Sequence, residues 1–357
     1  MDAEGCAGAH IRSESAASAF RAFQLTLPKL RIDPFIVALL LTVALASLVP
    51  CAGETARIMG WITDGAIALL FFLHGARLSR EAILAGAGAW RIHALALSST
   101  FVLFPAMGLI LRALGHGWLN PAIGDGILFL CLLPSTVQSS IAFTSIAHGN
   151  VPAAVCSASA SNLIGTFVTP VLTGLLLLGG SSGGGFPLDA LKSIMLQLLL
   201  PFVLGHLSRP LTAGFLTRNR TIIGKVDRSV ILLVVYTAFS AAVIEGLWHR
   251  YSWGDLGLTF GLNALILAIA LIATAFVSRR AGLSRADETA VVFCGSKKSL
   301  ASGVPMAGVL FPPAQLGPMI LPLMLFHQMQ LMACAVIAQR YAAAYERQQA
   351  RSAAQAR

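Results

Sequence analysis

Two adjacent lysines, Lys297 and Lys298, interrupt a run that is otherwise apolar and small. A single lysine in the middle of a membrane helix costs about 2.5–3.5 kcal/mol on insertion scales. Gly295 comes before the pair, and Gly303 and Pro305 follow it. Because glycine and proline weaken a helix, this stretch predicts a membrane helix that breaks at the lysines. Ammonium groups at such a break could neutralise an anionic solute or take the place of a bound cation.

A second interrupted stretch runs from Leu133 to Thr144. Pro134 lacks a backbone N–H donor, and several hydroxyl and amide side chains follow it closely. Taken alone, one proline with a few serines is more often a kink or a packing face than a site. Two interrupted spans at matching positions in the two halves of a chain favour a transport site instead, because half-helix ends direct their dipoles at ions and substrates.

Polar residues of the neighbouring spans extend the candidate site. Asn162 could reach the two breaks, although helix–helix hydrogen bonding explains it equally well. His327 and Gln330 share a helix face by i, i+3 spacing, and a lone histidine is more often a hydrogen-bonded core residue than a proton relay. The predicted substrate- or ion-binding residues are Lys297, Lys298, Ser296, Ser299, Gln138, Ser139, Ser140, Asn162, His327 and Gln330.

The composition indicates what surrounds these residues. Hydrophobic residues make up 56% of the chain and charged residues only 11%, whereas soluble domains carry about 25% charged residues. The chain is therefore predicted to be an all-α polytopic membrane protein in contact with the lipid bilayer. Six scattered cysteines without a C-x-x-C pair predict neither a disulfide framework nor a metal site. No cofactor is predicted.

Ten spans are predicted from the apolar runs: 34–50, 58–76, 92–111, 123–147, 151–178, 188–207, 229–248, 256–277, 288–310 and 316–338. With the N-terminus inside, 19 of the 25 Lys and Arg residues fall in inside segments and four in outside segments. This asymmetry predicts that both termini are cytoplasmic and that the protein lies in the cytoplasmic membrane. It also explains the net charge of +10 without a nucleic-acid partner.

The predicted organisation is a cytoplasmic tail (1–33), a five-helix repeat (34–178), a Gly/Ser linker (179–187), a second five-helix repeat (188–339) and a second cytoplasmic tail (340–357). An odd number of spans in each half forces the halves into opposite orientations. The chain is thus expected to form two inverted repeats, on topology rather than on residue-level similarity.

Three segments resemble the bile acid:sodium symporter-like family, most closely a divergent bacterial branch. They are Phe71–Ile83, Gly295–Pro305 and Leu325–Leu331, within a resemblance that covers about residues 30–342. The resemblance implies core and panel subdomains, two crossing discontinuous helices in the fourth and ninth spans, and sodium-coupled transport of organic anions.

The chain departs from the family pattern at the site itself. An alignment on Gly295 places Phe293 where the family has an acidic sodium ligand and Lys297 where it has a glutamine. A lysine could act as a tethered cation in place of sodium, or exchange a proton. The sequence therefore predicts a secondary carrier of a small or amphipathic organic anion, sodium-independent or proton-coupled. The alternative is a membrane regulator that acts through partners. An enzyme is not expected, since no G-x-S-x-G motif is present.

Overall fold

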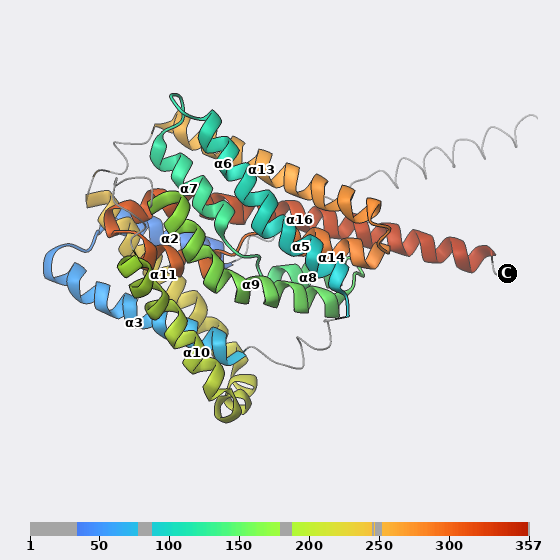
Figure 1. Cartoon of the computed structure of the whole chain (residues 1–357), viewed down its shortest axis with the longest axis horizontal. Coiled ribbons are helices and arrows are strands. Elements are labelled where there is room, and N and C mark those ends of the chain that lie inside the picture. The colour runs from blue at the N-terminus through green and yellow to red at the C-terminus, as the bar shows by residue number, and fades with distance from the viewer. Residues whose placement is uncertain (1–33, 78–87, 179–187, 245, 247–251, 356–357) are drawn as a thin grey trace, which may run out of the picture. The chain divides into compact units, whose positions relative to one another are not determined.

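The computed structural model describes residues 34–77, 88–178, 188–244, 246 and 252–355 (Figure 1). Every regular element in these ranges is a helix, which confirms the all-α class. The predicted N-terminal tail (1–33) and the Gly/Ser linker (179–187) lie outside the described residues.

The helices follow one another in chain order with short connections. They are α2 (Pro34–Leu48), α3 (Gly53–Arg77), α5 (Trp90–Ser98), the π-helix η1 (Ser99–Leu103), α6 (Phe104–Leu114), α7 (Pro121–Leu132), α8 (Gln138–Ile146), α9 (Val151–Thr173), the π-helix η2 (Gly174–Leu178), α10 (Leu188–Arg218), α11 (Arg220–Ile244), α13 (Trp253–Arg280), α14 (Arg285–Gly295), α15 (Leu300–Leu310) and α16 (Pro313–Gln355).

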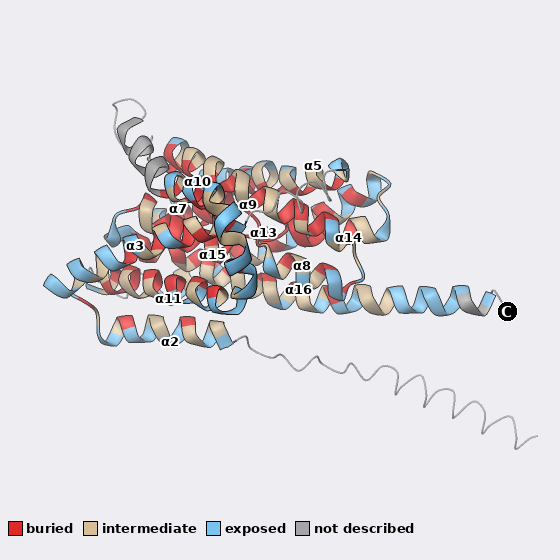
Figure 2. Cartoon of the chain, turned by 90° about the horizontal axis from the view of Figure 1, so that it is seen from below, coloured by how far each residue is buried: buried red, intermediate tan, exposed pale blue. Residues whose placement is uncertain are grey.

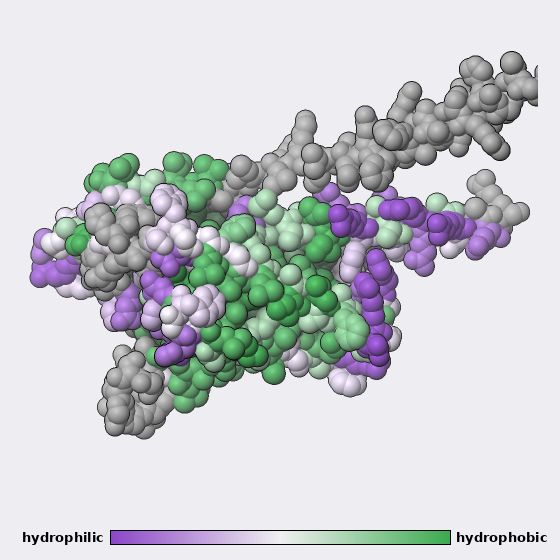
Figure 3. Space-filling view, turned by 90° about the horizontal axis from the view of Figure 1, so that it is seen from above, coloured by the Kyte–Doolittle hydropathy of each residue, from purple (hydrophilic) through white to green (hydrophobic). Residues whose placement is uncertain are grey.

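Six helices of the described chain are long and apolar enough to cross a membrane: Gly53–Arg77, Trp90–Leu114, Val151–Leu177, Arg220–Ile244, Trp253–Arg280 and Gln315–Ser352. The helices α7, α8, α14 and α15 have 9 to 12 residues each, so none of them spans a bilayer alone. The ten-span count and the inverted repeats stay predictions. On the face drawn in Figure 3, apolar surface covers the middle of the helices and hydrophilic residues gather toward their ends.

The helices α3 and α10 cross very closely. A Cβ atom added to Gly75 would overlap the Phe202 carbonyl, and one added to Gly205 would overlap the Phe72 carbonyl. Small residues at such a crossing let two membrane helices pack backbone to backbone. Buried residues are concentrated deeper in the bundle, where α14 and α15 pass through it (Figure 2).

Two helices extend beyond the predicted spans. The inside connection predicted between 207 and 229 is almost wholly helical, because α10 continues to Arg218 and α11 begins at Arg220. The helix α16 continues to Gln355, through most of the predicted C-terminal tail. Hydropathy marks where the membrane ends, whereas Ala, Gln, Arg and Glu continue a helix in water.

Candidate functional site

The first break separates α7 from α8. Leu133 has an extended backbone (φ −74°, ψ 155°), and Pro134 contributes no N–H donor. The Thr169 hydroxyl donates to the Leu132 carbonyl at 2.8 Å, and the Ser135 N–H donates to the Ser161 hydroxyl at 3.0 Å. Side chains of α9 therefore satisfy backbone groups that the helix end leaves unpaired.

The second break separates α14 from α15. The Ser299 side chain caps α15 by accepting the Ser302 N–H at 3.1 Å. The Ser299 N–H donates to the Pro134 carbonyl at 2.9 Å, so the two breaks are in direct contact. The Ser140 hydroxyl of α8 donates to the Phe293 carbonyl of α14 at 2.8 Å. These bonds tie together two segments that lie far apart in the sequence.

Lys298 is completely buried, and its ammonium group lies in a cage of backbone carbonyls. Nζ donates to the carbonyl oxygens of Thr100 at 2.9 Å, Cys131 at 2.9 Å and Leu133 at 2.6 Å. The face of the Phe104 ring lies 4.2 Å from Nζ. An ammonium group has three N–H donors, and here all three are used on carbonyls. We call these three oxygens the carbonyl cage.

Local backbone geometry makes the three carbonyls available. Thr100 lies in η1, where π-helical geometry disturbs the regular i to i+4 ladder. Cys131 and Leu133 lie at the C-terminal end of α7, where the last carbonyls have no helical partner and carry the negative end of the helix dipole. The cage therefore presents negative partial charge from two separate spans to one cation.

Lys297 is also completely buried, but its surroundings differ from those of Lys298. Its Nζ lies 3.5 Å from the Ser139 hydroxyl, 4.3 Å from the centroid of the Phe143 ring and 5.4 Å from that of Phe293. Aromatic faces stabilise a desolvated cation. The two adjacent lysines thus point into separate environments, as the 100° step between neighbouring helical residues leads one to expect.

Gln330 of α16 completes the second break. Its Oε1 accepts the Lys298 N–H at 2.8 Å, and its Nε2 donates to the Lys298 carbonyl at 2.9 Å. Nε2 also lies 2.8 Å from Nδ1 of His327. Since Nε2 can only donate, His327 accepts at Nδ1 and carries its ring proton on Nε2. The predicted pair of His327 and Gln330 is therefore in contact with the lysine stretch.

The remaining predicted residues differ in exposure. Gln138 is exposed, whereas Ser139 and Asn162 are half-buried. The Asn162 Oδ1 accepts the Ser302 hydroxyl at 2.7 Å, which links α9 to α15. Ser296 donates its hydroxyl to the Val292 carbonyl at 2.6 Å. Gln138, Ser139 and Asn162 are thus the predicted site residues within reach of a solute near the breaks.

Several residues of the site were absent from the sequence prediction. The three cage residues contribute backbone oxygens, so their side-chain types, Thr100, Cys131 and Leu133, carry no signal. Phe143 and Phe293 read as ordinary core residues. Pro134 was the one useful indication, because it marks where the C-terminal carbonyls of α7 lose their helical partners.

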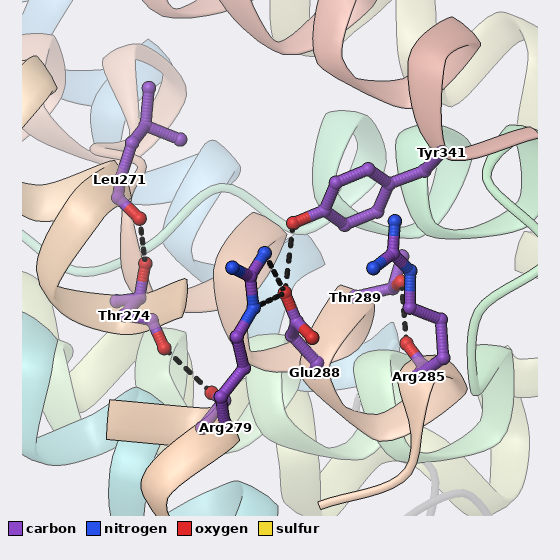
Figure 4. A network of polar contacts seen from close by, with 8 residues as sticks. Leu271, Thr274, Arg279, Arg285, Glu288, Thr289 and Tyr341 are labelled. Carbon is purple, nitrogen blue, oxygen red and sulfur yellow. Dashed lines mark hydrogen bonds and ion pairs between the residues drawn. The ribbon is translucent and has the colours of Figure 1, made fainter. Parts of the chain in front are cut away.

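A polar network holds the beginning of α14 in place (Figure 4). Glu288 is buried, and one of its carboxylate oxygens accepts from Arg279 Nε at 2.9 Å and from the Tyr341 hydroxyl at 3.0 Å. The Arg285 guanidinium lies 4.4 Å from the centroid of the Tyr341 ring. These contacts join α13, α14 and α16, so the half-helix that leads to Lys297 is fixed at its start.

Broken helices that meet inside an all-helical membrane protein define the class of a membrane transporter. Residues 33–343 match the model of the SBF-like CPA transporter family, and the chain belongs to that family. The protein named "Putative symporter YfeH" of Escherichia coli is 52% identical over 89% of this chain and 96% of its own length. An uncharacterized protein of Pseudomonas aeruginosa is 56% identical over 88% of this chain and 94% of its own. "Sodium/bile acid cotransporter 7-B" of Xenopus laevis is 28% identical over 87% and 92%.

The sodium site implied by the family resemblance does not fit the residues of this chain. Phe293 and Lys297 stand where an acidic ligand and a glutamine are expected, and an aromatic ring and an ammonium group cannot coordinate a cation. The oxygens that could coordinate one, those of the carbonyl cage, already accept hydrogen bonds from Lys298.

Proposed function

We propose that this protein is a secondary carrier of organic anions that works without sodium, because the Lys298 ammonium serves as a tethered cation. The carbonyl cage carries the proposal. It holds a positive charge with three hydrogen bonds at the point where two broken helices meet. A positive charge at this point is what a bound sodium ion would supply in a coupled carrier.

The substrate's anionic group is expected on the accessible side of the crossing. Both lysines have no exposed surface, so neither touches a solute in this conformation. Gln138 and Asn162 present amide donors there, and α8 begins at Gln138 with unpaired backbone N–H groups. Lys297 lies behind Ser139, where its charge adds to the positive potential that the anion meets.

The names of the similar proteins agree with such a substrate. The Xenopus protein is named for sodium and bile acid, and the Escherichia coli protein as a symporter. A small or amphipathic carboxylate or sulfonate is therefore the class of anion we propose for this chain. The proposed location is the cytoplasmic membrane, with both termini inside.

The test is the thermal stability of the purified protein in sodium chloride, potassium chloride and choline chloride at equal ionic strength. A ligand that binds the native state raises its apparent stability. The three salts are expected to give the same midpoint. A midpoint that rises with sodium alone would show a sodium site and would overturn the tethered-cation proposal.

The substrate part is tested separately with taurocholate, cholate and short monocarboxylates as probes. Anions that bind should raise the midpoint in the wild type and less so in Asn162→Ala, whereas Ser296→Ala, whose hydroxyl is used inside α14, serves as the control. Equal anion effects in the wild type and in Asn162→Ala would contradict the proposed position of the substrate.

A further inference from the structure

A separate cavity lies between the end of α6 and the beginning of α7, away from the crossing breaks. Its volume is about 320 Å³, which is enough for a lipid headgroup or a small solute. Arg112, His116, Asn120 and Asp125 line it together with glycines, among them Gly124. In Figure 1 the α6–α7 turn lies at the opposite end of the helices from the C-terminus, on the predicted outer side.

Opposite charges form one wall of this cavity. Arg112 Nε lies 3.1 Å from Asp125 Oδ1, and Arg112 Nη1 donates to the Leu176 carbonyl at 2.6 Å. The side chains of Arg112 and Asp125 are 40% and 31% exposed, so both are only partly covered. A guanidinium has five N–H donors and a carboxylate has two acceptor oxygens, so both groups retain hydrogen-bonding capacity toward the cavity.

Apolar residues lead from the cavity to the surface of α6. Ile110, Leu114 and Trp118 are 55%, 68% and 57% exposed. The Trp118 indole N–H donates to the Leu114 carbonyl at 2.7 Å, which fixes the ring beside the cavity. Tryptophan is typical of the membrane–water interface, where its ring lies at the level of the headgroups. A molecule that enters the charged cavity from this side would extend an apolar part along α6.

We propose that this cavity binds the headgroup of a zwitterionic phospholipid that carries a primary amine, phosphatidylethanolamine being the simplest example. The free donors of Arg112 would hold the phosphate, and the free Asp125 oxygen would accept from the ammonium. The acyl chains would then follow Ile110 and Leu114 into the bilayer. This inference is independent of the proposed transport function.

The pairing of charges selects the headgroup. An anionic headgroup without an amine would bring its negative charge against Asp125, and a lone cation would meet Arg112. A zwitterion offers each wall residue its complement. The exposed pair of Arg57 and Glu54 on α3 provides a matched comparison, because it has the same charges but does not line the cavity.

Native mass spectrometry of the full-length protein in detergent tests the proposal. Phosphatidylethanolamine is expected to bind at least about tenfold more tightly than phosphatidylglycerol with the same chains. The Arg112→Gln/Asp125→Asn double variant should lose that preference, and Arg57→Gln should keep it. Gly124→Leu should also lose it by filling the cavity, since a Cβ atom there meets only Leu119 at ordinary contact distance.

Three results would overturn the proposal. Equal binding of the two lipids would remove the role of the charge pair. An unchanged preference in both Gly124→Leu and the double variant would place the lipid elsewhere. Equally tight binding of soluble glycerophosphoethanolamine, which has the headgroup but no acyl chains, would identify the ligand as a soluble zwitterion.

Discussion

Replacing Lys298 with alanine should turn the carbonyl cage into a site for a free cation. The substitution removes the ammonium group and leaves the carbonyls of Thr100, Cys131 and Leu133 buried without a donor. Each unpaired buried acceptor costs about 1–3 kcal/mol, and losing one partner of a buried charged network costs about 3–5 kcal/mol. Because neighbouring effects do not add fully, we expect a loss of about 3–5 kcal/mol.

Ammonium and methylammonium should restore much of this stability. The N···O distances of 2.6–2.9 Å suit an N–H donor, and at 100 times its Kd a ligand restores about 2.7 kcal/mol. Potassium, which has nearly the radius of ammonium, should stabilise more than the smaller sodium ion. Tetramethylammonium has the same charge but no N–H donors, so it should not stabilise the variant.

The assay is thermal unfolding of purified protein, with each cation present from extraction onward. At about 2–4 °C per kcal/mol, the midpoint should fall by about 10 °C in Lys298→Ala and recover by more than half with ammonium. Lys297→Ala is the matched control, because Lys297 contacts one hydroxyl at 3.5 Å and no carbonyl. A midpoint unchanged by the substitution, or equal rescue by tetramethylammonium, would refute this account of the cage.

Two further predictions concern the scaffold around the site. Glu288→Gln should lower the stability by about 1–3 kcal/mol in thermal unfolding, since a buried carboxylate loses its charge-assisted bond with Arg279. An unchanged midpoint would mean that the network in Figure 4 does not hold α14 in place. Gly205→Ala should destabilise the protein strongly, because its Cβ would overlap the Phe72 carbonyl. Gly214→Ala, in the same helix with open space around it, should be neutral or stabilising by up to about 1 kcal/mol, and equal effects of the two would contradict the close crossing.

The sequence predicted the parts of the site that have a backbone signature. Pro134 removes a donor, and adjacent lysines are too costly inside an intact apolar helix, so both breaks had a physical reason to occur there. The cage could not be predicted in this way, because any residue type supplies a carbonyl oxygen. Its formation depends on η1, whose π-helical geometry has no reliable signature in Ser99–Leu103.

Exposure was also beyond the reach of sequence patterns. Gln138 and Ser140 are two residues apart and equally polar, yet Gln138 is exposed and Ser140 is buried with its hydroxyl bonded to α14. Which residue faces the partner helix depends on how the two broken spans are oriented. Similarly, hydropathy could not show that α16 continues to Gln355, since helix propensity rather than burial sustains that segment.

The fixed position of the Lys298 ammonium has an electrical consequence. A cation that is covalently part of the protein returns with it in every cycle, so it transfers no net charge. Under the proposed mechanism, a monovalent anion that moves alone then works with or against the membrane potential by about 2.3 kcal/mol per 100 mV. With the interior negative, uptake would be opposed by this amount and release would be favoured. The tethered cation therefore favours an exporter or an anion exchanger over an accumulating importer.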